Sequence, residues 1–582
     1  MNYPEITKPK VTEMKVVPNL LSEGDLTSKT PWPDIERELG VEGRDSFNLA
    51  CLAIDRHCES GRGDKVALLW EGKDGREESY TFEQLRILTN KFAHVLDRLG
   101  VQKGDRVFVF AGRVPELYVT VFGTLKLGAV IGPLFSAFGP DPVRDRLLDS
   151  GAQVLITTPD LKARLLPILK DLPQLRHIIL IEREGRAAEM DEGDVRYEQA
   201  MAAATSDPPD TATGREDYSI MHYTSGTTGK PKGAVHVHEA AIQHYATGKW
   251  ALDLHPDDIY WCTADPGWVT GTSYGMSAPW LNGVTQLIYE GGFGAGAWYT
   301  AIQKHRVTVW YTAPTAIRML MKVGDEVPRK HDLSSLRHIC SVGEPLNPEA
   351  IVWGHKVFHQ AIHDNWWQTE TGAILIANYP FMAVRPGSMG KPIPGVTPAI
   401  VDEAGNEMPP DAEGDLAVRP GWPSIFRTYW SNDTLYRSRF NNGWYITGDR
   451  ARRDKDGYFW FVGRTDDVIN TAGHLVGPFE VESALMEHPT VAEAGVIGKP
   501  DPLAMEVVKA FVALKEGHEP TDNLRRELMR FIRGRLSAAV APREIEFLSS
   551  LPKTRSGKIM RRLLKAKELG LPLGDTSTLE ED

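Results

Sequence analysis

A glycine-rich stretch, residues 223–233, constrains this chain more than any other feature. It reads Tyr-Thr-Ser-Gly-Thr-Thr-Gly-Lys-Pro-Lys-Gly and follows residues 218–223, which predict a short strand. Glycines let a backbone turn tightly and present its N–H groups to an anion, while lysines and hydroxyls add donors. The stretch is not a Walker motif, because Gly229 and Lys230 are followed by Pro231, whereas that motif has Ser or Thr at this position. We interpret it as a loop that binds a polyphosphate, although such residues are also typical of simple turns.

The bulk composition narrows the class of protein. The 582 residues are 42% hydrophobic and 25% charged, which is ordinary for a globular protein with a large core. A net charge of -12 argues against nucleic acid as the main partner. We find neither an apolar run of about 18 residues nor a signal-peptide pattern, so we expect no membrane partner. Four cysteines without zinc or CxxC spacing fit a reducing, cytoplasmic location: Cys51, Cys58, Cys262 and Cys340.

Strands and helices alternate through the first 200 residues. Short apolar runs at 106–111, 154–158 and 177–181 predict buried strands, and residues 81–99 have a helical pattern. Such alternation is typical of parallel sheets covered by helices. We therefore predict an α/β fold.

The predicted secondary structure changes twice in the second half of the chain. Residues 386–465 consist of short β runs separated by Gly and Pro. After Arg464, residues 492–497 and 509–514 predict strands, and 523–536 predict an amphipathic helix with apolar side chains every four residues. This indicates a separate small α+β domain. The first 40 residues are expected to lie over the surface, and the acidic tail 574–582 to be disordered.

Several further motifs appear in a fixed order and resemble one known family. They are Ser-Val-Gly-Glu-Pro at 341–345, Asp-Asn-Trp-Trp-Gln-Thr-Glu-Thr-Gly at 364–372, Tyr-Ile-Thr-Gly-Asp at 445–449, Gly-Arg-Thr-Asp at 463–466 and Leu-Pro-Lys-Thr-Arg-Ser-Gly-Lys-Ile-Met at 551–560. With the glycine-rich stretch, they make residues 65–565 resemble the acyl-CoA synthetases of the acyl-adenylate-forming superfamily. The acetyl-CoA synthetase branch is the most similar.

The resemblance implies both a fold and a reaction. The fold would be a large N-terminal domain, residues 1–465, with two β-sheet/helix subdomains and a distorted β-barrel. A small α+β C-terminal domain, residues 467–582, would rotate about a hinge at Asp466. The reaction would be the ATP-dependent ligation of acetate, or propionate, to coenzyme A. A carboxylate is a poor acyl donor, so it first becomes an acyl-AMP; AMP and pyrophosphate are released, and positioning and charge stabilisation dominate catalysis.

The resemblance also assigns the nucleotide contacts. The glycine-rich loop would hold the β- and γ-phosphates, the 341–345 segment the adenine, and Asp449 with Arg464 the ribose. Glu370 would bind Mg²⁺, which prefers carboxylate and phosphate oxygens. The complete ATP and AMP set is Thr224, Ser225, Gly226, Thr227, Thr228, Gly229, Lys230, Lys232, Gly343, Glu344, Pro345, Asp364, Asn365, Trp366, Trp367, Gln368, Thr369, Asp449 and Arg464.

Lys558 is the predicted catalytic residue. In the family, this lysine enters the site on the C-terminal domain and neutralises the negative charge that gathers during adenylation. An isolated lysine near a chain end is normally only a solvated charge, so the prediction depends on the resemblance. Acetylation would remove its positive charge, which makes a lysine acetyltransferase and a deacetylase candidate partners.

The coenzyme A site is matched only in part. The resemblance assigns it to Thr270, Ala472, Gly473 and Arg533. Leu475 departs from the pattern, because relatives commonly have arginine there. His488 resembles a cation position of the family, but lone histidines are more often structural.

One side chain predicts the size of the acid. Val269, Thr270 and Val342 would form the walls of the acid pocket, and the indole of Trp367 would close its end. Relatives for longer acids have glycine at the Trp367 position, so overlap with the indole would exclude long chains. Residues 477–485 nevertheless resemble the medium-chain branch.

Three other functions stay open. The chain could be a propionyl- or medium-chain acyl-CoA synthetase, or an adenylating enzyme that loads a carrier protein. Gly473 and Arg533 favour free coenzyme A over a carrier protein. A nucleotide-binding protein without catalysis is the third alternative, against which Lys558, Glu370 and the intact loop argue.

Overall fold

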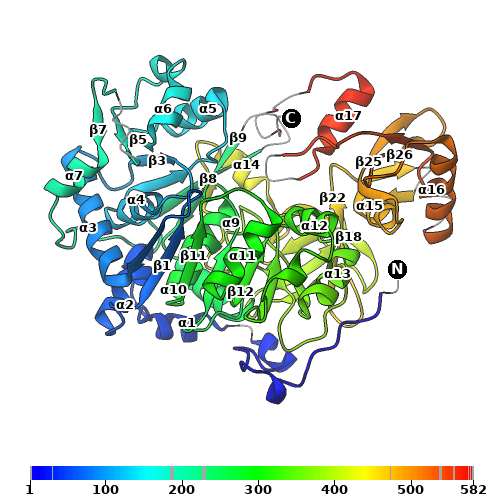
Figure 1. Cartoon of the computed structure of the whole chain (residues 1–582), viewed down its shortest axis with the longest axis horizontal. Coiled ribbons are helices and arrows are strands. Elements are labelled where there is room, and N and C mark those ends of the chain that lie inside the picture. The colour runs from blue at the N-terminus through cyan, green and yellow to red at the C-terminus, as the bar shows by residue number, and fades with distance from the viewer. Residues whose placement is uncertain are drawn as a thin grey trace.

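The computed structural model (Figure 1) describes residues 3–28, 30–183, 189–225, 231–471, 474–536, 540–554, 558–573, 576 and 579. These residues form three sheets with helices packed on them. No helix among them is both long and apolar enough to cross a bilayer.

The first sheet carries the predicted strands of the N-terminal region. In order it contains β19 (Thr428–Tyr429), β9 (Pro231–Val237), β8 (Tyr218–Ser225), β4 (Val130–Pro133), β3 (Arg106–Phe110), β5 (Val154–Thr157), β6 (His177–Leu180) and β7 (Asp194–Arg196). The strands from β8 through β4 to β7 pair in parallel, as predicted. Strands β8 and β9 are antiparallel, so the glycine-rich stretch joins the two arms of a hairpin.

The second sheet has fourteen strands and changes from parallel to antiparallel along its length. Its parallel part holds β14 (Ile362–Trp366), β13 (His338–Ser341), β12 (Val309–Thr312), β10 (Ile259–Cys262), β11 (Thr285–Tyr289) and β1 (Val66–Glu71), edged by antiparallel β2 (Glu77–Thr81). Its antiparallel part holds β15 (Ile376–Ala377), β16 (Ser388–Pro392), β22 (Phe459–Arg464), β21 (Trp444–Arg453), β18 (Glu413–Val418) and β17 (Pro398–Val401), with β20 (Phe440–Asn441) on β21. The strands expected to form a distorted barrel therefore continue the large sheet.

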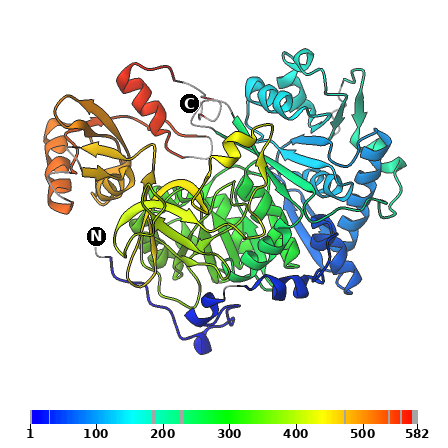
Figure 2. The same ribbon diagram turned by 180° about the vertical axis from the view of Figure 1, so that it is seen from behind.

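The third sheet belongs to the small C-terminal region. It contains β24 (His474–Val476), β23 (Ile469–Thr471), β26 (Met505–Leu514) and β25 (Val491–Asp501), with β27 (Glu544–Phe547) on β26. The amphipathic helix predicted at 523–536 is α16 (Asp522–Arg535), which buries Leu528 and Ile532 as its spacing predicts. Figures 1 and 2 show this region beside the large one, joined to it after β22.

Helices cover the sheets. They are α1 (Trp32–Leu39), α2 (Arg56–Glu59), α3 (Phe82–Arg98), α4 (Pro115–Lys126), α5 (Pro140–Ser150), α6 (Pro159–Leu165), α7 (Tyr197–Ala203), α8 (Ala240–Trp250), α9 (Val269–Thr272), α10 (Ala278–Leu281), α11 (Ala295–His305), α12 (Pro314–Val323), α13 (Pro348–Phe358), α14 (Asp433–Arg437), α15 (Pro478–Met486), α16 and α17 (Arg561–Leu569). Helix α3 begins where its sequence requires, because Thr81 and Gln84 form a reciprocal capping box. Strands such as β3 and β5 are buried throughout or nearly so, as parallel strands between helices are.

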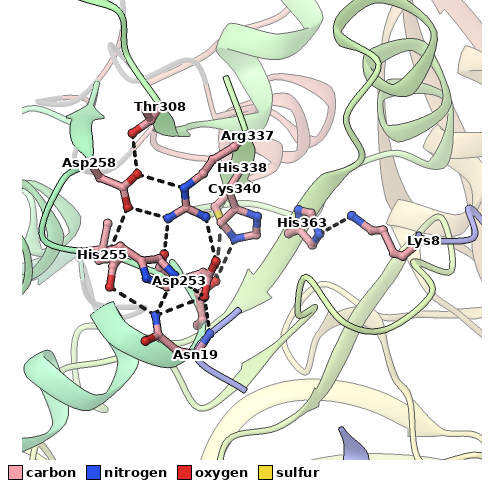
Figure 3. A network of polar contacts seen from close by, with 12 residues as sticks. Lys8, Asn19, Asp253, His255, Asp258, Thr308, Arg337, His338, Cys340 and His363 are labelled. Carbon is pink, nitrogen blue, oxygen red and sulfur yellow. Dashed lines mark hydrogen bonds and ion pairs between the residues drawn. The ribbon is translucent and has the colours of Figure 1, made fainter. Parts of the chain in front are cut away.

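The N-terminal segment lies over the surface, as predicted, but also reaches the back of the large sheet. Figure 3 shows Lys8 pointing at His363 of β14; its Nζ lies 2.8 Å from Nε2 of that histidine. Nearby, the backbone N–H of Asn19 donates to Asp253, which also accepts from Arg337 at 2.7 Å. This network ties the segment to the strands that carry the predicted adenine contacts. The acidic tail lies mostly outside the described residues.

The start of α15 packs closely against β22. A Cβ added to Gly477 would lie 2.2 Å from the carbonyl oxygen of Val462. Only glycine therefore fits at the point where the small region meets the large sheet in this arrangement.

Gly390 of β16 generates a stability prediction. Its φ is +95°, and a Cβ there would lie 2.0 Å from the carbonyl oxygen of Ala377. We expect Gly390→Ala to reduce the free energy of unfolding by about 3 kcal/mol or more, since backbone strain and overlap add. Thermal unfolding followed by circular dichroism measures the effect.

Gly457→Ala is the matched control. Gly457 also has a positive φ, +85°, but its added Cβ meets nothing within 4 Å. Its substitution should cost only the backbone term of about 1–2 kcal/mol. Equal shifts in melting temperature for the two variants would contradict the packing argument.

Candidate functional site

Asp449 lies at the centre of the predicted nucleotide site. Its Oδ2 accepts hydrogen bonds from Trp366 Nε1 and Gln368 Nε2, each at 2.9 Å, and its Oδ1 from Arg464 at 3.0 Å. Burial raises the pKa of Asp449, and the charge of Arg464 opposes that shift. Asp449, which follows Gly448 within β21, thus joins the end of β14 to the end of β22. Its oriented carboxylate has the chemistry to accept from ribose hydroxyls.

The predicted adenine residues follow β13. Oε1 of Glu344 accepts from the backbone N–H of Thr315 at 3.0 Å and also from its hydroxyl, while Oε2 accepts from Arg318 at 2.8 Å. The neighbouring Asp364 is buried, its Oδ1 has no hydrogen-bond partner among the described residues, and burial raises its pKa well above the ordinary value. A buried acceptor of this kind suits a ligand that brings a donor.

The predicted end of the acid pocket is rigid. Trp367 is buried and its Nε1 donates to the hydroxyl of Tyr311 at 3.2 Å. Its ring meets Tyr274 edge to face at 5.1 Å between centroids. Val342 belongs to the same buried cluster, and Val269 packs against that cluster from α9. Val269, Val342 and Trp367 thus all lie in or against the extensive hydrophobic core of the large region, while Thr270 lies half-buried beside Val269.

The predicted magnesium ligand lies on the phosphate side. Tyr429 donates to Glu370 Oε1 at 2.7 Å, and Phe426 N–H donates to its backbone carbonyl at 2.9 Å. Lys232 of β9 lies 6.0 Å from the Tyr429 ring. Burial lowers the pKa of Lys232, and the charges of Arg439 and Arg464 lower it further. Positive charge is thus gathered around one acidic side chain, as a bound polyphosphate and cation require.

Arg439 is a further candidate site residue, which the sequence did not reveal. It interacts with Tyr429, Tyr445 and Glu370, and its Nε is buried without a hydrogen-bond partner among the described residues. No motif surrounds it, because it precedes the Gly448 turn by nine positions on an irregular segment. Only the fold places it beside the predicted phosphate site.

The remaining predicted contacts lie along the strands or outside the described residues. Gly226, Thr227, Thr228, Gly229 and Lys230 of the phosphate loop lie outside the described residues. The flanking Thr224 and Ser225 close β8 opposite Lys232 and Pro231. Gly343 follows β13, Asn365 lies near the end of β14, and Thr369 follows β14. Of the coenzyme A set, Ala472 and Gly473 are not described, and Arg533 is exposed on α16.

Lys558 faces the nucleotide site from the C-terminal region. It lines a cavity together with Glu344 and Pro345 from one side and Arg561 from its own. Partial desolvation and the charges of Arg464 and Arg561 lower the pKa of Lys558, although its side chain keeps contact with solvent. Asp449 and Glu344 act in the opposite direction.

The segment carrying Lys558 is fixed by a buried ion pair. Arg561 donates to Glu482 of α15 through Nε at 2.7 Å and through NH2 at 2.5 Å. The bidentate pair connects the start of α17 to α15, the helix that packs on β22, and so links the segment that carries Lys558 to that helix.

The predicted hinge residue is Asp466, and the second predicted cation ligand is His488. Asp466 is exposed between β22 and β23 and lies 3.6 Å from Arg464 Nε. His488 Nδ1 lies 2.8 Å from the Thr490 hydroxyl, and Nε2 lies 3.3 Å from Glu527. Within the described residues, no three His, Cys, Asp or Glu side chains converge as a metal site.

Comparison with known proteins places these motifs in a family. The model of the AMP-binding enzyme family matches residues 54–430, and that of the AMP-binding enzyme C-terminal domain matches residues 480–558. The acetyl-coenzyme A synthetase of Bacillus subtilis is 55% identical over 94% of this chain and 96% of its own. That of Pyrobaculum arsenaticum is 43% identical over 93% of this chain and 86% of its own.

Two solved structures share the fold. An acyl-CoA synthetase of Brucella canis is 37% identical with a TM-score of 0.70, covering 90% of this chain and 95% of its own. The anthranilate CoA ligase AuaEII, solved with anthranoyl-AMP, is 31% identical with a TM-score of 0.82, covering 90% of this chain and 98% of its own. The large α/β region followed by a small C-terminal one is the architecture of adenylate-forming enzymes, and the chain belongs to the AMP-binding enzyme family.

Proposed function

We propose that this chain is an acetate–CoA ligase that forms AMP, working through an acetyl-AMP intermediate. Support comes from acetyl-coenzyme A synthetases that are 41–55% identical over most of the chain. The observation that carries the choice of a short acid is Trp367, whose indole is buried and held by Tyr311. The proposed location is cytoplasmic, on the composition argument alone.

The first half-reaction needs charge stabilisation rather than covalent help from the protein. An acetate oxygen attacks the α-phosphorus of ATP, and the bond to the bridging oxygen breaks, so pyrophosphate leaves with the electron pair. Lys558 supplies an ammonium where negative charge gathers. Lys232 and the 226–230 loop hold the leaving phosphates, and Asp449 holds the ribose.

Magnesium fits the donors at Glu370. Tyr429 donates to Oε1, and a carboxylate is the kind of ligand that joins phosphate oxygens and water around a hard cation. When bound, the ion would neutralise phosphate charge. His488 is the weaker candidate, because both of its ring nitrogens contact protein groups.

The second half-reaction follows a rotation of domain 467–582 on domain 1–465 about Asp466. Lys558 lines a cavity with Glu344 and Pro345 in the present arrangement, which supports a role in adenylation. After rotation, the coenzyme A thiolate attacks the acetyl carbonyl carbon and AMP leaves. Thr270, Ala472, Gly473 and Arg533 are the proposed coenzyme A contacts, with Leu475 replacing the arginine of relatives.

A panel of acids tests the proposal. AMP release that depends on coenzyme A should be fastest with acetate among acids of two to eight carbons, with propionate second. A maximum at longer acids would instead favour the medium-chain alternative. Release that requires a carrier protein and ignores free coenzyme A would favour the carrier-loading one.

Trp367→Gly should shift the preference toward acids of about four to eight carbons. Each added methylene would then gain burial worth about 0.8 kcal/mol, or roughly fourfold in kcat/KM. Trp367→Phe is the control, because it keeps most of the bulk and should keep the preference for acetate. An unchanged preference in a folded Trp367→Gly enzyme would disprove the pocket assignment.

Lys558→Ala should separate the half-reactions. Acetate-dependent exchange of pyrophosphate into ATP should fall by about 10²–10³-fold, as when other charge-stabilising donors are removed. Conversion of supplied acetyl-AMP and coenzyme A should continue. Lys553→Ala is the matched control, because Lys553 lies on the same segment but pairs with Glu493. Equal loss in both halves would refute the two-orientation mechanism.

Acetylation of Lys558 should switch off the first half-reaction alone. The modified side chain loses the ammonium but not its place on the segment. Enzyme with acetyl-lysine incorporated at this position, checked by mass spectrometry, should use acetyl-AMP and fail in pyrophosphate exchange. Full overall activity at complete acetylation would exclude this regulation by an acetyltransferase and a deacetylase.

A further inference from the structure

A hydrogen bond between two buried side chains crosses from the large region to the C-terminal one. Asn347, which precedes α13 of the large region, donates through Nδ2 to the hydroxyl oxygen of Ser483 on α15 at 2.9 Å. Asn347 keeps 3% of its surface exposed and Ser483 keeps 1%. Because both side chains are shielded from water in this arrangement, the loss of one would leave the other buried without that partner.

On the large side, the amide of Asn347 is connected to a predicted adenine contact. Arg318 of α12 donates through NH2 to Oε2 of Glu344 at 2.8 Å, and its NH1 lies 3.4 Å from Oδ1 of Asn347. A guanidinium can only donate, so it keeps the amide oxygen toward Arg318 and the amide nitrogen toward Ser483. The bond between the regions therefore begins in the group of side chains that holds Glu344.

On the C-terminal side, α15 is connected to the segment that carries Lys558. Glu482 precedes Ser483 and accepts the two hydrogen bonds of Arg561, which follows Lys558 by three positions. The backbone N–H of Val496 in β25 donates to the same carboxylate at 2.9 Å. The contacts that start at Ser483 thus continue to the base of the lysine segment.

The two ends of this series of contacts meet in one cavity. Glu344, Arg318 and Asn347 line it from the large region, and Glu482, Arg561 and Lys558 line it from the C-terminal one. The arrangement that forms the bond between Asn347 and Ser483 is therefore also the arrangement in which Lys558 shares a cavity with Glu344.

We propose that Asn347 and Ser483 are positioning residues that hold the C-terminal region in the orientation for adenylation. The inference rests on the proposed two-orientation function. Rotation about Asp466 separates α15 from α13 and breaks the bond, so the bond stabilises one orientation and not the other. Both residues act through the placement of Lys558 rather than on the reacting atoms.

Ser483→Ala removes the hydroxyl with little change in volume. In the adenylation orientation it leaves the amide of Asn347 buried without this acceptor, so acetate-dependent pyrophosphate exchange should fall about 5- to 20-fold. The rate with supplied acetyl-AMP and coenzyme A should stay the same or rise, because the other orientation loses nothing. The ratio of the two rates is the decisive readout, since a loss of folded enzyme would lower both rates equally.

A double-mutant cycle tests whether the bond itself is responsible. Asn347→Ala should change the ratio in the same direction as Ser483→Ala. The double variant should change it by less than the product of the two single effects, because both substitutions remove the same bond. Effects that multiply in full would show that the two side chains act separately, and the proposal would be wrong.

Thr157→Val is the matched control within the large region. The hydroxyl of Thr157 is also buried, and it donates to the carbonyl of Phe110 at 2.8 Å inside the first sheet. Its removal costs a buried hydrogen bond away from the boundary, so the ratio should not change. The proposal is overturned if Ser483→Ala leaves the ratio unchanged, or if Thr157→Val changes it equally.

Lys558→Ala, measured in parallel, separates this inference from the function on which it rests. If Lys558→Ala lowers exchange alone while Ser483→Ala leaves the ratio unchanged, the two orientations stand and the role of the bond is wrong. If acetate does not support exchange in the unaltered enzyme, the ratio is measured with the best acid of the panel. If no acid supports exchange, the ligase function is wrong, and the inference falls with it.

Discussion

A single buried carboxylate organises the site. Asp449 joins the end of β14, through Trp366 and Gln368, to β22 through Arg464. A buried charge without partners is strongly unfavourable, so these donors hold the strands in one arrangement whenever the chain is folded. The bonds thus connect the parallel part of the large sheet to its antiparallel part, beside the residues predicted to bind the nucleotide. The carboxylate is oriented before any nucleotide arrives, which reduces the cost of ordering on binding.

Local rules were enough to predict much of the fold. Strands β3, β5 and β6 and helices α3 and α16 lie where the alternation of apolar runs and the helical spacing placed them, because these signals act within a few residues. The predicted α/β class and family are confirmed. The family motifs also named Asp449, Arg464, Trp367 and Lys558. Arg464 donates to Asp449, the charges of both residues act on Lys558, and Trp367 follows Trp366, which donates to the same carboxylate.

Contacts between distant segments could not be predicted. Arg439 carries no motif, and only the pairing of β20 with β21 brings it to the phosphate side. Tyr3 and Glu349 are 346 positions apart, and no local pattern records their contact. Likewise, the sequence predicted a strand followed by a loop, but not that the next strand, β9, pairs antiparallel with β8. Such features depend on tertiary packing, which propensity and spacing do not encode.

Gly477 lies where the C-terminal region meets the large sheet, and its lack of a Cβ has a consequence for the orientation of that region. The missing Cβ matters only while α15 lies against the Val462 carbonyl of β22. In any orientation that separates these two groups, a methyl group at position 477 would meet no such obstacle. The energetic cost of a side chain there would therefore fall on one orientation and not on the other, which shifts their relative populations rather than the stability of either region. If the C-terminal region rotates as proposed, a side chain at position 477 would thus disfavour the present orientation without altering any proposed substrate contact.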